Sequence, residues 1–167
     1  GLSIWSHIRS NDAFEWVHHT QDVRLRISGI FSVMQDVETG GRGFLLTSQD
    51  QYLEPYESAK ALIEDDFREL RQATADNQRQ QERLDALKLL VDESLGVTRQ
   101  AIDSLRDKGL EAALKFLPAG KRLMDGIRRS VREISAEEER LLEQRERLSQ
   151  TSATTTTVAI CTAIVMI

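Results

Sequence analysis

The chain has 167 residues, which is enough for one domain with a substantial hydrophobic core. Two prolines and 5% aromatic residues, beside many Leu, Glu, Arg, Ala and Gln residues, predict an all-α protein. The net charge of −5, with charges of both signs interspersed, argues against a nucleic-acid-binding protein, whose surface needs a basic excess or stripe. Cys161 is the single cysteine, which excludes an intrachain disulfide and a zinc site built from cysteines.

The first expected element is a long helix over residues 10–47. Its inward stripe advances alternately by four and three residues, through Val23, Ile27, Ile30, Met34, Val37, Gly41 and Phe44. Trp16 and Thr20 continue the stripe backwards. Trp16 is expected to anchor the helix in the core or against a neighbouring helix, with stacking on a ligand as the alternative. Either Asn11 or Asp12 caps this helix, or the helix continues from the preceding residues.

The stripe passes through three glycines, at positions 40, 41 and 43. Each glycine destabilises a helix interior by about 0.8–1.0 kcal/mol relative to alanine. The cluster therefore indicates either a loop or a helix whose backbone approaches a neighbour closely. The unbroken stripe favours the helix, and Glu38 and Arg42 have the spacing and order of a helical ion pair. The helix is expected to end near Thr47, with Ser48 or Asp50 capping the next one.

Residues 38–56 contain a distinctive set of residues: Glu38, Thr39, Gly40, Arg42, Gly43, Leu45, Leu46, Thr47, Tyr52, Leu53, Pro55 and Tyr56. This set resembles the signature of CHASE3 domains. Upstream, His19, Thr20 and Val23 also fit the family pattern, whereas Phe44 stands where tyrosine is usual and Ser48 where glycine is common. The resemblance implies an extracytoplasmic sensor domain of a bacterial transmembrane receptor, most often a histidine kinase.

A second helix is expected over residues 50–75 and a third over residues 78–108. The inward stripe of the second is Tyr56, Lys60, Ile63, Phe67 and Leu70, with Leu53 and Ala59 beside it. Pro55 falls within its first turns, where a missing N–H costs least. Asn77 is expected to cap the third helix and Gly109 to end it. The inward residues of the third helix are Leu84, Leu87, Val91, Leu95, Thr98, Ile102 and Leu105.

The last long helix is expected from about Lys121 into the apolar tail. A short helix over residues 110–116 and a break or kink at residues 118–120 precede it. Its heptad positions are Met124, Ile127, Val131, Ile134, Glu138, Leu141, Arg145 and Leu148. Glu138 and Arg145 at inward positions indicate polar layers or a less tightly packed stalk.

Four long helices with short corners predict an antiparallel up-down-up-down four-helix bundle with long first and last helices. Residues 158–167 carry no charge. They are expected to begin a second, truncated transmembrane helix, since a complete span needs about 20 apolar residues. The alternatives are a sticky extension or a buried strand. The expected organisation is the end of a first span over residues 1–9, with Trp5 at the membrane interface, the sensor bundle over residues 10–150, and a Ser/Thr-rich juxtamembrane segment with the second span over residues 151–167.

Candidate sites are few. Glu15 and His18 form one metal-like pair, but a di-iron bundle needs two such units and two further glutamates, so neither a metal site nor a cofactor is expected. No nucleophile–base set suggests a catalytic residue, and no Gly-Lys-Ser/Thr follows the glycines to make a phosphate loop. The candidate ligand-binding residues are Arg42, Glu38 and Trp16. Arg42 suits an anion, although an ion pair with Glu38 that pins the helix corner is the preferred interpretation.

The predicted function is the signal-input domain of a bacterial transmembrane receptor, with a two-component sensor histidine kinase as the favoured parent. The domain itself is expected to be non-catalytic, with the kinase beyond Ile167. The expected partners are a second copy of the chain, the membrane through flanking helices, and a small-molecule or protein signal, without nucleic acid. The expected location is the periplasmic side of the inner membrane. The alternatives are the input domain of a chemotaxis receptor or a diguanylate cyclase, or a structural dimerisation bundle.

Overall fold

A computed structural model of the chain describes the backbone of residues 2–165 and the side chains of residues 15–145 and 147. In chain order its elements are α1 (Leu2–Thr47), a 3-10 turn η1 (Asp50–Leu53), α2 (Glu54–Ala73), α3 (Gln78–Lys108), α4 (Leu110–Leu114) and α5 (Leu117–Val165). Residues 2–165 contain no strand, so the predicted all-α class is confirmed. The side chains of Trp5, Leu148 and residues 158–167, on which predictions were made, lie outside the described residues.

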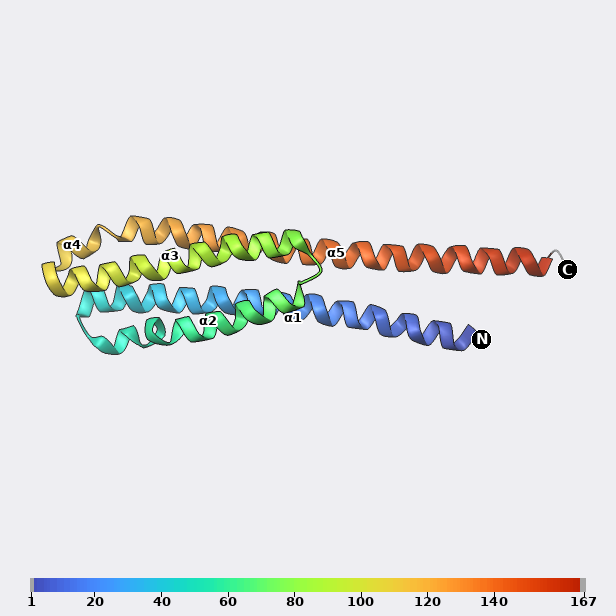
Figure 1. Ribbon diagram of the computed structural model, residues 1–167, viewed down its shortest axis with the longest axis horizontal. Coiled ribbons are helices and arrows are strands. Elements are labelled where there is room, and N and C mark those ends of the chain that lie inside the picture. Colours follow the sequence, from blue (N-terminus) through green and yellow to red (C-terminus); the bar gives the residue numbers. More distant parts are fainter. Residues whose placement is uncertain (1, 166–167) are drawn as a thin grey trace. The chain divides into compact units, whose positions relative to one another are not determined.

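The chain forms two compact units. One is Val23–Ser135, and the other combines Gly1–Asp22 with Ala136–Ile167. Both α1, with 46 residues, and α5, with 49 residues, run without a break through parts of both units (Figure 1). In the described part of the chain, no helix is both long and apolar enough to cross a membrane.

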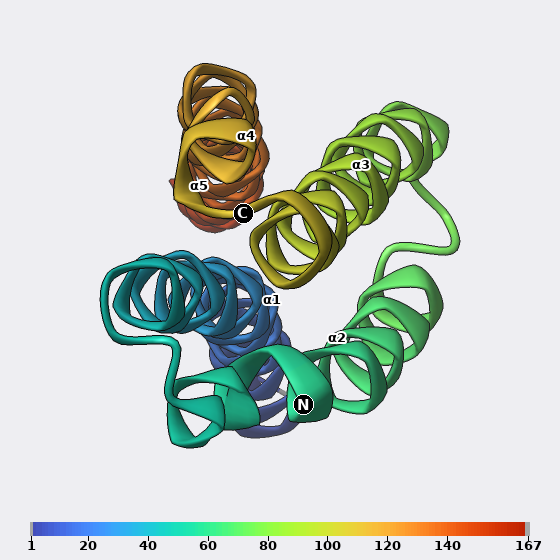
Figure 2. The ribbon, with the colours of Figure 1, turned by 90° about the vertical axis from the view of Figure 1, so that its left-hand side faces the viewer.

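Within Val23–Ser135, four helices surround one core. Viewed from the end, their order around the core is α1, α2, α3 and α5, and successive helices run in opposite directions (Figures 1 and 2). This arrangement confirms the antiparallel up-down-up-down bundle with long first and last helices. The core is made of the stripes that the heptads predict, including the fully buried Ile27, Ile30, Met34, Leu70, Leu84, Leu87 and Ile127.

Several helix boundaries agree with the sequence. Asn77 caps α3, since its side chain accepts a hydrogen bond from the Gln80 N–H at 3.2 Å. Gly109 ends α3 with φ of 83°, a conformation that glycine adopts without strain. Gln80 is fully buried and donates from Nε2 to the Ile134 carbonyl at 3.3 Å, which ties α3 to α5.

Two predicted helix starts were wrong. The first helix begins at Leu2 and not near residue 10, so Asn11 and Asp12 lie inside it, and the alternative that the helix continues from the preceding residues is confirmed. No glycine or proline stands between Leu2 and Asp12 to stop the helix, and the cap prediction relied on residue type alone. The last helix begins at Leu117 and not at Lys121. Pro118 therefore lies in the first turn, where its lack of an N–H leaves no helical hydrogen bond unmade.

The start of the second helix also differs from the prediction. Neither Ser48 nor Asp50 caps it, because α2 continues directly from the 3-10 turn and has Leu53 at its N-cap without a side-chain hydrogen bond. Lys60 is exposed rather than inward, and the buried Ala59 takes that place. Alanine fits between two helices without the cost of desolvating an ammonium group.

Candidate functional site

The end of α1 packs closely against the segment that follows the corner. A Cβ atom added to Gly40 would overlap the carbonyl oxygen of Tyr52, and one added to Gly43 would lie 2.6 Å from the Tyr52 ring. These two glycines therefore permit the close backbone approach that the sequence indicated. Phe44 and Leu53 are buried beside this contact, in one cluster with Ile102 of α3.

The corner itself is held by local polar contacts. Ser48 has φ of 57°, which lies in the left-handed region of backbone conformation that residues other than glycine rarely adopt. The Thr47 hydroxyl donates to the Gly43 carbonyl at 2.8 Å and accepts from the Gln49 N–H at 3.3 Å. Arg106 of α3 reaches the corner, where it donates to Asp50 at 2.7 Å and lies 5.3 Å above the centre of the Phe44 ring.

Most residues of the CHASE3-like signature are thus buried or half-buried at this corner. Leu45 and Leu53 are buried, and Pro55 and Tyr56 are half-buried. Thr39 and Leu46 face solvent, and Leu46 remains 80% exposed. Nothing in the structure explains why a leucine stands at position 46.

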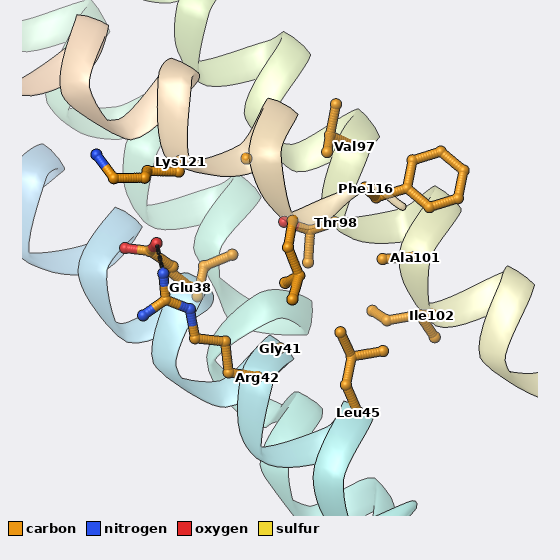
Figure 3. A pocket seen from close by; sticks show the side chains of 13 residues that line it. Glu38, Gly41, Arg42, Leu45, Val97, Thr98, Ala101, Ile102, Phe116 and Lys121 are labelled. Atoms are coloured by element: carbon orange, nitrogen blue, oxygen red, sulfur yellow. Dashed lines mark hydrogen bonds and ion pairs between the residues drawn. The ribbon is translucent and has the colours of Figure 1, made fainter. Parts of the chain in front are cut away.

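A pocket opens beside this corner, within the unit Val23–Ser135 (Figure 3). Its volume is about 50 Å³. Its lining residues are Val37, Glu38, Gly41, Arg42 and Leu45 of α1; Val97, Thr98, Ala101 and Ile102 of α3; Phe116 in the turn before α5; and Leu117, Gly120 and Lys121 at the start of α5. Glu38, Arg42 and Lys121 gather on one side, and apolar side chains occupy the other (Figure 3).

Two separate sets of ion pairs lie at the charged side of the pocket. Arg42 donates from Nη2 to Glu38 Oε1 at 2.6 Å, which confirms the ion pair expected from their spacing. Lys121 donates to Asp125 at 2.6 Å, and Arg128 donates to the same carboxylate at 2.8 Å. The hydrogen bond from Lys121, with support from the charge of Arg128, holds the pKa of Asp125 below its usual range. Asp125 therefore stays ionised and keeps the Lys121 ammonium partly neutralised.

Gly41 differs from its two neighbouring glycines, because it faces the pocket. A Cβ atom added there would meet only Thr98 Cγ2, at 3.4 Å, which is van der Waals contact. The signature quoted above leaves position 41 unspecified. Packing alone therefore does not require glycine at this position, whereas it does at Gly40.

Trp16 does not line this pocket. It belongs to the unit formed by Gly1–Asp22 and Ala136–Ile167, where the Arg145 guanidinium lies 3.6 Å from the centre of its ring. Its side chain is 38% exposed and also makes an edge contact with His19. The contact between Trp16 of α1 and Arg145 of α5 supports the expected role of Trp16 as an anchor between helices. Its exposure does not support a position in the core.

The same unit contains the predicted polar layer. Glu138 is only 1% exposed although it carries a carboxylate, and its Oε2 lies 3.8 Å from His19 Nε2. Thr20 is equally buried on α1. The heptad thus placed Glu138 correctly on the inward face of α5. Glu15 and His18 are both exposed, and no three metal-ligating side chains come together among the described residues.

Sequence reasoning found the α1 side of the pocket and missed the rest. Thr98 was expected only as a core residue, and Ala101, Phe116 and Lys121 carry no local signal that would single them out. They come together because α3 and the start of α5 both approach α1 at the pocket, a relation that no short motif encodes.

Comparison with known proteins agrees with this architecture. The family model described as CHASE3 domain matches residues 13–147. Among solved structures, the chain is similar to the sensor domain of histidine kinase HK9 from Rhodopseudomonas palustris, with a TM-score of 0.68 and 30% sequence identity. The similarity covers 74% of this chain and 98% of the HK9 sensor domain. None of the curated proteins matches the chain. Because the match to the family extends over most of its length, the chain belongs to the CHASE3 domain family.

Proposed function

We propose that this sensor domain is the extracytoplasmic input of a bacterial transmembrane histidine kinase. The observation that carries the proposal is the similarity to the HK9 sensor domain, which spans nearly all of that domain and is named as part of a histidine kinase. On this proposal the domain contains no catalytic residues, and phosphoryl transfer takes place in a separate kinase region on the other side of the membrane.

The helical connectivity supplies a physical route for the signal. Both α1 and α5 are unbroken, over 46 and 49 residues respectively, which supports a signal that passes along a helix. We propose that a signal shifts α5 relative to α1 between two packed arrangements, and that the displacement of α5 reaches the kinase.

We further propose that the receptor works as a homodimer with α5 near the two-fold axis. A test uses single cysteines at exposed positions on two sides of α5: Arg132, Glu139 and Glu143 on one side, and Glu133, Arg140 and Gln144 on the other. Cys161 is first replaced by serine, so that each variant carries one cysteine. Oxidation of membranes that contain the receptor should give crosslinked dimers at positions that repeat with the period of a helix.

The pattern should change when the receptor is stimulated. Equal crosslinking at all six positions, or none at any of them, would contradict both the dimer and the place of α5 within it. A periodic pattern that is the same with and without the stimulus would favour a purely structural dimerisation bundle.

A further inference from the structure

We propose that the pocket between α1, α3 and the start of α5 binds a small monocarboxylate with a short apolar body, and that this ligand is the signal. The proposal rests on the function proposed above, because it supplies the stimulus for that receptor. Four features of the pocket support it: its size, its charge, its glycine and its position on α5.

The size suits a ligand of a few heavy atoms. The pocket has a volume of about 50 Å³, whereas a single water needs about 10–15 Å³ of such space. The wall opposite the charged residues is apolar, with Leu45, Val97, Ala101 and Ile102 among its side chains. A branched or straight chain of about three to five carbons would fill this volume and cover the apolar wall.

The charge at the pocket favours an anion. Two cationic side chains, Arg42 and Lys121, and one carboxylate, Glu38, line it. The charged residues that line the pocket thus carry two positive charges and one negative charge. The Arg42 side chain is 57% exposed despite its pairing, so its guanidinium has donors left for a second carboxylate.

Gly41 is the one glycine of α1 that lines the pocket. A methyl group at this position would fit against Thr98 without a clash, and alanine would favour the helix more than glycine does. Glycine here therefore weakens α1 locally and leaves the pocket open between the charged and the apolar sides. We infer that the space is used by a ligand.

The position of the pocket links it to signalling. Leu117, Gly120 and Lys121 belong to the first turn and a half of α5, and Glu38 to Leu45 belong to α1. A ligand held by Arg42 and Lys121 would therefore draw the start of α5 toward α1. This is the pair of helices whose relative displacement the proposed function requires.

The binding test is isothermal titration calorimetry on the full 167-residue chain in a buffer free of carboxylates and phosphate. The ligands are sodium propionate, butyrate and isovalerate, with butyramide, butylamine and sodium sulfate as matched probes. At least one monocarboxylate should bind, at least about tenfold more tightly than the amide, the amine or sulfate. Binding of the amide or amine as tight as that of the carboxylates would overturn the charge assignment, and equally tight sulfate binding would overturn the apolar contact.

Variants locate the site. Gly41→Ala should weaken binding by at least about tenfold while the melting temperature rises. The matched control is Gly96→Ala, because a Cβ atom at Gly96 in α3 meets nothing within 4 Å; it should leave the affinity unchanged. Arg42→Gln should weaken binding. Glu38→Gln should strengthen it by about three- to tenfold, because the variant removes the carboxylate that competes for Arg42.

The outcomes separate this proposal from the proposed function. If no carboxylate binds, or if Gly41→Ala binds as tightly as the unaltered chain, the pocket proposal is wrong. The cysteine crosslinking described above does not depend on the ligand, so a periodic dimer pattern would still support the receptor. A ligand that binds at the pocket without a change in the crosslinks would instead contradict signalling through α5.

Discussion

Three glycines within four residues of α1 have different neighbours, and substitutions at each should have different effects. Gly40→Ala forces a methyl group against the Tyr52 carbonyl, which belongs to the backbone and cannot rotate away. We expect it to lower the free energy of unfolding by about 1–3 kcal/mol. Gly41→Ala should instead raise it by about 0.8–1.0 kcal/mol, because the methyl group fits and alanine favours the helix.

Urea denaturation of both variants measures these changes. Gly96→Ala serves as the control for helix propensity alone, since it lies inside α3 with open space around it. If Gly40→Ala were as stable as Gly41→Ala, the close approach of Tyr52 to α1 would be disproved.

Ser48 is strained at the corner after α1. A φ of 57° lowers the stability of the folded state by roughly 1–2 kcal/mol when the residue has a Cβ atom. Glycine at this position would remove part of that penalty. We expect Ser48→Gly to stabilise the domain by about 0.5–1 kcal/mol, after allowance for the greater flexibility of glycine in the unfolded chain. For a protein of this size, a melting temperature higher by about 1–4 °C would result. Ser48→Ala, which keeps the strain, is the control and should show no such gain.

The heptad pattern of α5 places a glutamate, Glu138, at an inward position where apolar residues are usual. Glu138 occupies an inward position, is 1% exposed and lies 3.8 Å from His19. Buried charges cost desolvation energy, and an apolar residue of similar size is often as stable or more stable. We expect the double variant Glu138→Leu/His19→Leu, which replaces both partners of the pair, to raise the free energy of unfolding by about 1–4 kcal/mol.

Thermal denaturation followed by circular dichroism measures this effect. The control is Glu139→Leu, at an exposed position of the same helix, which should change stability little. A loss of stability in the double variant would show that the contacts of Glu138 and His19 outweigh their desolvation. The gain that we expect would indicate that the carboxylate is kept at this layer for a purpose other than stability, such as permitting α5 to move.

At the scale of the whole molecule, the proposed signal depends on the continuity of α5. Arg147 is exposed and lies beyond the unit Val23–Ser135 that contains the pocket. Arg147→Pro would remove a helical hydrogen bond and kink the helix at a local cost of about 3 kcal/mol. In a receptor in which the chain is joined through a membrane helix to a histidine kinase, this variant should abolish the response of autophosphorylation to the stimulus.

The control is Arg147→Ala, which removes the same ion pair with Glu143 and preserves the helix. It should respond like the unaltered receptor. Carboxylate binding should be the same in both variants, because the pocket lies elsewhere in the chain. A normal response in Arg147→Pro would show that a rigid α5 is not needed.

Much of the fold was determined by the sequence itself, through local interactions. The bounds of α3 from Gln78 to Lys108 follow from the Asn77 cap and from Gly109, which act on the turns beside them. The Glu38–Arg42 pair follows from a spacing of four residues, and Glu138 was placed on the inward face by the heptad alone. These features could be predicted because each depends on residues within one or two turns of a helix.

Only the tertiary structure decided which residues form the pocket and what each glycine does. Gly40 and Gly41 are adjacent and chemically identical, yet one contacts Tyr52 and the other faces Thr98, 57 positions further along the chain. The prediction that Lys60 faces inward failed for a similar reason. The space between two packed helices accommodates the small side chain of Ala59, which is buried there instead. Clearances of a few tenths of an ångström between distant segments are set by how whole helices pack, and no local pattern in the sequence records them.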